Sequence, residues 1–110
     1  MTTLKQLHKL KNTSITGNTQ RGTCLLHGSK IVMWTDSSVT VSLCGYNTLT
    51  TRRRIKQVLQ ILGVEACVYK HNHIPYLQVL HYPPVEMDPY AQYTILDGDV
   101  YSDPHKETSR

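Results

Sequence analysis

Three consecutive arginines follow a Gly- and Thr-rich stretch, at the point where the sequence predicts the start of a helix. Cations at this end oppose the helix macrodipole and cost on the order of a few tenths of a kcal/mol each. First-turn N–H groups, threonine hydroxyls and guanidinium groups all suit phosphate oxygens, so an anion would offset that cost. We therefore predict a site for phosphate groups of nucleic acid or a nucleotide, formed by Thr48, Thr50, Thr51, Arg52, Arg53, Arg54 and Lys56.

Different roles are expected within this predicted site. Arg53 and Lys56 supply exposed charge, while Thr50 or Thr51 caps the helix and orients its first turn. If Arg52 or Arg54 bends back over the sheet, its role is structural. A second interpretation stays open, because the stretch lacks the fixed spacing of a P-loop. In that interpretation a threonine only caps the helix, and the arginines are solvated or paired with the acidic C-terminal segment.

Two other groups of residues suggest metal or nuclease chemistry but fit it poorly. His71-Asn72-His73 matches the letters of the HNH nucleases, whose residues are spread over a ββα unit, so we expect a hairpin turn here. Cys24-x-x-His27 and His71-x-His73 together offer four zinc ligands. Cys24 lies in a predicted strand, however, and no second pair has the usual spacing. We expect no metal and no cofactor.

General acid–base residues are scarce in the body of the chain, where Asp36 and Glu65 are the only carboxylates before residue 83. The spacing of the histidines and cysteines requires no catalytic triad. We expect a protein without enzymatic activity. A small enzyme such as a nucleotide hydrolase is a third interpretation, which needs an acid–base pair beside the helix start.

The charge of the chain is divided along its length. Residues 1–82 carry ten Lys and Arg against two carboxylates, whereas residues 83–110 carry two against six. This pattern suits an anionic partner for the body. An alternative function is inhibition of a host or defence protein by protein–protein contact, with the acidic segment as a mimic of nucleic acid. In that case the protein serves host takeover or anti-defence.

Hydrophobic periodicity predicts a single α+β domain over residues 1–82, with a short helix over 1–11 and a core over 23–80. The order β-β-β-α-β-β predicts one small, mainly antiparallel sheet with an amphipathic helix packed on one face. The other face stays open, so a homo-oligomer is among the expected partners. Residues 83–110 are expected to form a partly ordered, Pro-containing extension in which Asp97-Gly98 turns a hairpin. The predicted strands are 24–27, 30–35, 38–43, 66–70 and 76–80, and the predicted helix ends before Gly63.

Cysteine content and hydropathy argue against a disulfide-rich protein and a membrane protein. Three cysteines, Cys24, Cys44 and Cys67, rule out a complete disulfide framework, and their apolar surroundings predict buried, reduced thiols. No segment approaches the roughly 20 apolar residues that a membrane span needs, so no membrane partner is expected.

The stretch from Gly45 to Ile55 resembles a family of small uncharacterised bacteriophage proteins. The resemblance rests on a helix start of the form G-aromatic-x-T-x-T-T-[KR]-x-R-[IM], with Val68-Tyr69 and Tyr76 at the matching places downstream. It covers about residues 22–80. It implies a viral origin and location in the host cytoplasm, and it supplies no activity. The leading prediction is a small non-enzymatic phage accessory protein that binds phosphate groups.

Overall fold

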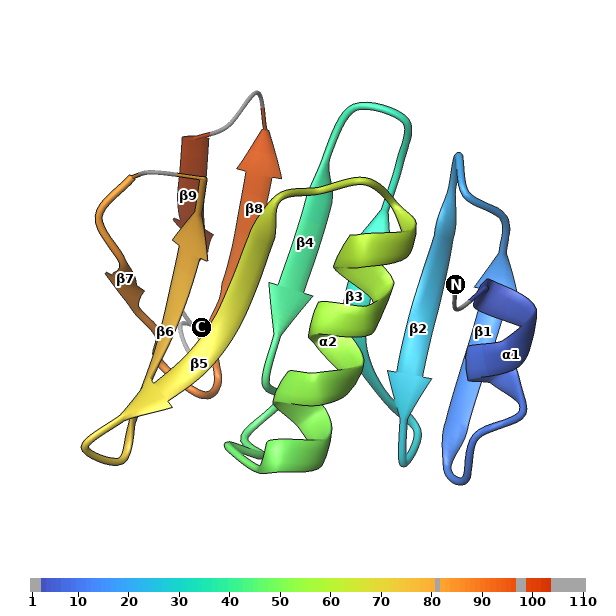
Figure 1. Cartoon of the computed structure of the whole chain (residues 1–110), viewed down its shortest axis with the longest axis horizontal. Coiled ribbons are helices and arrows are strands. Elements are labelled where there is room, and N and C mark those ends of the chain that lie inside the picture. The colour runs from blue at the N-terminus through green and yellow to red at the C-terminus, as the bar shows by residue number, and fades with distance from the viewer. Residues whose placement is uncertain (1–2, 81, 97–98, 104–110) are drawn as a thin grey trace, which may run out of the picture.

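The computed structural model describes residues 3–80, 82–96 and 99–103. Its largest element is an antiparallel six-stranded sheet with the strand order β1-β2-β3-β4-β8-β9 (Figure 1). A second, three-stranded antiparallel sheet has the order β5-β6-β7. The elements in chain order are α1 (Leu4–His8), β1 (Thr13–Gly17), β2 (Gly22–Leu26), β3 (Ser29–Trp34), β4 (Val39–Ser42), α2 (Leu49–Ile61), β5 (Ala66–His71), β6 (Ile74–Val79), β7 (Val85–Glu86), β8 (Gln92–Leu96) and β9 (Asp99–Asp103).

The two sheets and α2 form two layers. The six-stranded sheet is the rear layer in Figure 1, and α2 and the three-stranded sheet lie in front of it. The predicted α+β fold, with one helix on a mainly antiparallel sheet and a short N-terminal helix, is confirmed. The difference is that β5 and β6 do not join the main sheet. They pair with each other and with β7 to form a separate sheet beside α2. Alternate residues of this sheet, such as Val68 and Leu77, are buried in the shared core.

The acidic segment after residue 82 contributes strands to both sheets. β8 pairs with β4 over Val39↔Ile95 to Ser42↔Gln92, which places it inside the six-stranded sheet rather than in an extension. The expected hairpin is present, since β8 pairs with β9 up to Leu96↔Asp99, while the predicted turn residues 97–98 lie outside the described residues. The pairing of β8 with β4 was not predicted, because partners such as Val41 and Tyr93 are far apart in sequence.

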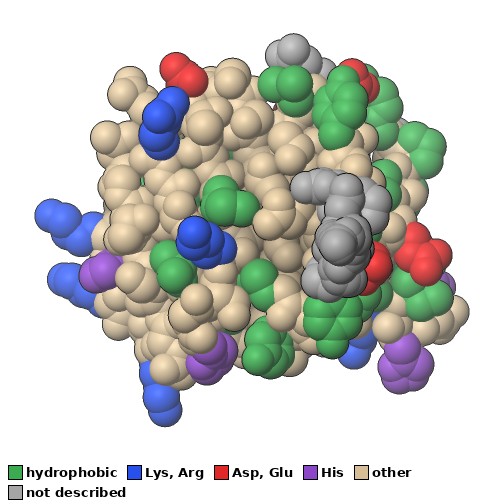
Figure 2. Space-filling view, turned by 180° about the vertical axis from the view of Figure 1, so that it is seen from behind, with side chains coloured by type: hydrophobic (Ala, Val, Ile, Leu, Met, Phe, Trp, Pro, Cys, Tyr) green, Lys and Arg blue, Asp and Glu red, His purple; other side chains and the backbone are tan. Residues whose placement is uncertain are grey.

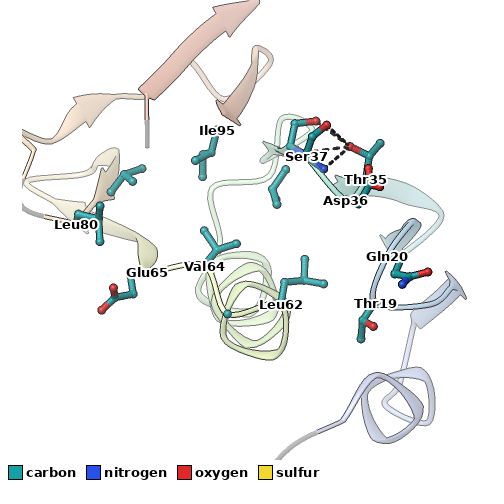
Figure 3. A pocket seen from close by; sticks show the side chains of 14 residues that line it. Thr19, Gln20, Thr35, Asp36, Ser37, Leu62, Val64, Glu65, Leu80 and Ile95 are labelled. Carbon is teal, nitrogen blue, oxygen red and sulfur yellow. Dashed lines mark hydrogen bonds between the residues drawn. The ribbon is translucent and has the colours of Figure 1, made fainter. Parts of the chain in front are cut away.

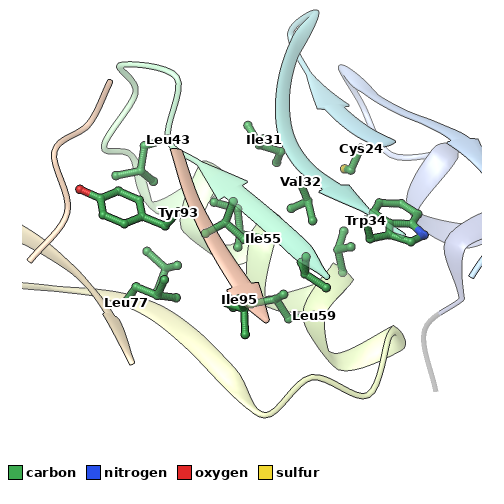
Figure 4. Close-up of a cluster of buried hydrophobic side chains, with 14 of the residues drawn as sticks. Cys24, Ile31, Val32, Trp34, Leu43, Ile55, Leu59, Leu77, Tyr93 and Ile95 are labelled. Atoms are coloured by element: carbon green, nitrogen blue, oxygen red, sulfur yellow. The ribbon is translucent and has the colours of Figure 1, made fainter. Parts of the chain in front are cut away.

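The core fills the space between the six-stranded sheet and the front layer (Figure 4). Ile55, Val58 and Leu59 form the buried face of α2, as the helical periodicity predicted. Trp34 anchors the core from β3, and its indole Nε1 donates to the carbonyl oxygen of Asn18 at 2.6 Å. This bond ties the turn between β1 and β2 to the core.

Helix α1 protects one edge of the main sheet. The N–H of Ile15 in β1 donates to Nδ1 of His8 at 2.9 Å, and the N–H of Thr13 donates to the carbonyl of Leu10 at 3.1 Å. Both donors would otherwise face solvent on an edge strand, where they could pair with another chain. Thr3 caps α1 in a capping box with Gln6.

The rear face of the six-stranded sheet has no covering layer among the described residues (Figure 2). Its side chains are largely neutral, and the hydroxyls of Thr40 and Thr94 on neighbouring strands lie 2.9 Å apart. In this view most Lys and Arg side chains gather on the β1 side and most carboxylates on the β9 side. Self-association through this face stays a prediction.

The placement of β8 is testable with two adjacent residues. Ile95 is 7% exposed and Leu96 is 36% exposed. Ile95→Ala leaves a cavity between the layers, so we expect the free energy of unfolding to fall by about 2–5 kcal/mol. Leu96→Ala is the matched control and should cost less than half as much. Equal effects of the two substitutions in denaturant melts would contradict a buried β8.

Candidate functional site

A sharp turn between β4 and α2 positions the predicted site. Cys44 and Gly45 both have positive φ, at 52° and 82°, and the N–H of Gly45 donates to the carbonyl of Pro89 at 2.7 Å. A Cβ at Gly45 would lie 2.6 Å from a ring carbon of Tyr90. Glycine is therefore required both by its backbone conformation and by the close approach of the aromatic ring.

The N-cap of α2 is Thr48, and neither Thr50 nor Thr51 has the predicted capping role. The Thr48 hydroxyl accepts the N–H of Thr51 at 3.2 Å and lies 2.9 Å from the hydroxyl of Thr51. The helix begins two or three residues earlier than predicted because the extended backbone of Thr48 already presents its side-chain oxygen to the first turn. Thr51 is buried, and Thr50 is exposed.

The side chain of Arg52, near the N-terminus of α2, is buried. It is only 8% exposed, and Nη1 donates to Oδ1 of Asn47. The Nδ2 group of Asn47 in turn lies 3.5 Å from the carbonyl oxygen of His73, in the turn between β5 and β6. Arg52 therefore links the start of α2 to the three-stranded sheet through a neutral amide.

Arg54 lies on the other side of α2. Its Nε donates to the hydroxyl of Thr13 in β1 at 3.1 Å, and its Nη1 donates to Oε1 of Gln57 at 2.7 Å. The same guanidinium is close enough to Cys24 to lower the pKa of that thiol, but burial dominates and raises the pKa to about 11. Cys24 is consequently a neutral thiol at physiological pH, and all three cysteines are free.

The three arginines do not form one patch. Arg52 faces the three-stranded sheet, Arg54 faces β1, and Arg53 is exposed together with Thr48, Thr50 and Lys56. The acceptors of Arg52 and Arg54 are neutral oxygens. Among the described residues no carboxylate pairs with either guanidinium, so the interpretation that the acidic segment neutralises the arginines gains no support there.

The sequence model of the Kyanoviridae Gp96 protein family matches residues 2–99. The chain belongs to this family of bacteriophage proteins. The match runs from α1 into β9 and crosses the predicted boundary at residue 82. That the helix-start motif is characteristic of this family stays a prediction. No curated protein and no solved structure matches the chain.

The residues that suggested nuclease chemistry lie in an ordinary hairpin turn, as predicted. Asn72 and His73 form the two-residue turn of the β5–β6 hairpin, both with positive φ. Over the part of the chain that the structure describes, no group of three or more potential ligands is placed to hold a metal ion. Within the same residues, no helix is long and apolar enough to cross a membrane.

Sequence reasoning missed the neutral partners of the arginines. Asn47, Thr13 and Gln57 were not predicted as partners of the arginines. Thr13 is 41 residues from Arg54, and no local pattern signals a contact of that range. Only the position of Gln57, three residues after Arg54 on the helix, could have indicated a pair.

The role of Thr48 as N-cap predicts unequal effects at two neighbouring threonines. Thr48→Ala removes the acceptor of the Thr51 N–H and should lower the free energy of unfolding by about 1 kcal/mol. Thr50→Ala removes an exposed hydroxyl within the helix and should change stability by less than half of that. If chemical denaturation gave the larger loss for Thr50→Ala, the observed cap would be wrong.

Proposed function

We propose that this bacteriophage protein binds phosphate groups of nucleic acid or of a nucleotide at the N-terminal end of α2. The observation that carries the proposal is Arg52, a guanidinium more than nine-tenths buried whose side-chain partner is the neutral Asn47. Burying an ion without a counter-charge costs on the order of several kcal/mol. An anion at this position would provide the missing charge.

The guanidinium of Arg52 is not completely sealed from solvent. No described side-chain nitrogen or oxygen is both sealed from solvent and without a hydrogen-bond partner. The nitrogens of Arg52 that Asn47 does not engage therefore retain some contact with solvent. Guanidinium groups bind phosphate oxygens in pairs, so these nitrogens could donate to such an anion.

The helix start adds further donors and charge beside Arg52. The N–H groups of Leu49 and Thr50 begin α2 and have no acceptor one turn earlier in the helix. Thr50 and Arg53 lie three residues apart on the exposed face, so hydroxyl and guanidinium can meet the same phosphate. The first turn of α2 contains no acidic residue that would repel an anion.

Exposed aromatic side chains favour a ligand that also carries bases. Tyr46 is 57% exposed in the turn before α2, and Tyr90, whose ring lies against Gly45, is 62% exposed. Bases stack on such rings with little sequence preference, which is typical of single-strand binding. The alternative of inhibition by an acidic mimic has no comparable support, since residues 85–86, 92–96 and 99–103 are strands rather than a free tail.

The proposal predicts the effect of removing the exposed charges. Arg53→Ala combined with Lys56→Ala should weaken binding of a 20-nucleotide single-stranded DNA about tenfold in fluorescence anisotropy. The slope of log K against log salt should also become shallower, by roughly 0.7 for each phosphate that the variant no longer neutralises. The same titration with duplex DNA and with a nucleoside triphosphate identifies which source of phosphate is bound.

The matched control is Arg21→Ala combined with Lys30→Ala. It removes the same charge from exposed positions outside α2, in the turn before β2 and in β3. Equal weakening by the two double variants would show binding by net charge alone and contradict a site on α2. No binding of any of the three ligands by the unmodified protein would also contradict the proposal.

A further inference from the structure

A pocket of about 560 Å³ lies at the opposite, C-terminal end of α2. Its floor is aliphatic and comes from the end of α2 and from the strands β6 and β8, with Leu62, Val64, Val79 and Ile95 (Figure 3). Gly63 ends the helix in a Schellman motif, in which the N–H groups of Gly63 and Val64 bond back to Gln60 and Leu59. The chain therefore leaves the helix axis at Gly63 and continues toward β5, beside the pocket.

Two carboxylates stand on different walls of this pocket. Asp36 lies on the turn between β3 and β4, and Glu65 lies between α2 and β5 (Figure 3). The backbone is fixed at both positions. The Thr35 hydroxyl accepts the N–H groups of Ser37 and Ser38 at 3.2 Å, and the carbonyl of Glu65 accepts the N–H of Leu80 at 2.9 Å. Asp36 and Glu65 are thus held apart with the aliphatic floor between them.

The charge of this pocket is opposite to that of the rest of the body. None of its described lining residues is Lys, Arg or His, although residues 1–82 are strongly cationic. The last turn of α2 has no basic residue either, so the negative end of its macrodipole is uncompensated. Both carboxylates are exposed, and in the described part of the chain neither has an ion-pair or hydrogen-bonding partner for its side chain.

We propose that this pocket binds a linear aliphatic diammonium ion. One ammonium group pairs with Asp36 and the other with Glu65, while the methylene chain covers the aliphatic floor. An apolar floor suits an organic cation better than a metal ion, which needs several oxygen ligands. The pocket lies at the other end of a 13-residue helix from the proposed phosphate site, so the two proposals are independent.

The test is a titration of the ¹⁵N-labelled protein with 1,4-diaminobutane, followed by NMR. We expect shifts centred on residues 35–38 and 62–65. Asp36→Asn combined with Glu65→Gln should weaken binding at least tenfold. Both residues are exposed, so the double variant should fold. A dispersed NMR spectrum of the variant will verify this. 1-Aminobutane should bind at least threefold more weakly than the diamine, and 1,4-butanediol should not bind.

Two matched controls separate this site from bulk attraction. Glu86→Gln combined with Asp99→Asn removes the same charge from exposed positions that do not line the pocket and should leave binding unchanged. Arg53→Ala combined with Lys56→Ala should also leave it unchanged, even if phosphate binding is abolished. Shifts elsewhere, equal weakening by the two carboxylate double variants, equal affinity for the monoamine, or no binding at millimolar concentration would each overturn the proposal.

Discussion

A buried guanidinium with a neutral partner is the feature on which the proposed function depends. Arg52 lies at the positive end of α2, where the helix macrodipole already disfavours a cation, and its side chain bonds to the amide of Asn47. The sheet, the turn at Gly45 and the β5–β6 hairpin hold this arrangement in place. A protein rarely retains an uncompensated charge at such a position without a counter-ion, and this is the physical basis for assigning an anion site to the helix start.

The electrostatics of α2 are inverted at both of its ends. Its first turn carries no acid but is followed directly by arginines, whereas its last turn carries no base and opens on a pocket with two carboxylates. Each end therefore lacks the charge that would stabilise it from within the chain. The start of α2 thus carries basic residues and its end borders a pocket with two carboxylates, and the length of the helix separates them.

Much of the architecture could be predicted from local patterns. The alternation of Val39, Val41 and Leu43 and the helical spacing of Ile55, Val58 and Leu59 identified elements whose apolar faces are buried. Gly63 marked the end of the helix correctly. The division into two sheets and the position of β8 could not be predicted, because strand partners such as Val39 and Ile95 are far apart in sequence. For the same reason, the contact of Arg54 with Thr13, 41 residues away, could not be predicted.

The most direct test of the anion site is an NMR titration of the unmodified protein with inorganic pyrophosphate. It follows the backbone amides of Leu49 and Thr50 and the side-chain Nε–H of Arg52 at low salt. We expect these three signals to shift most and to follow one binding curve, and we expect added salt to weaken the binding. Saturation of shifts elsewhere on the protein while these three signals stay still would contradict a phosphate site at the start of α2.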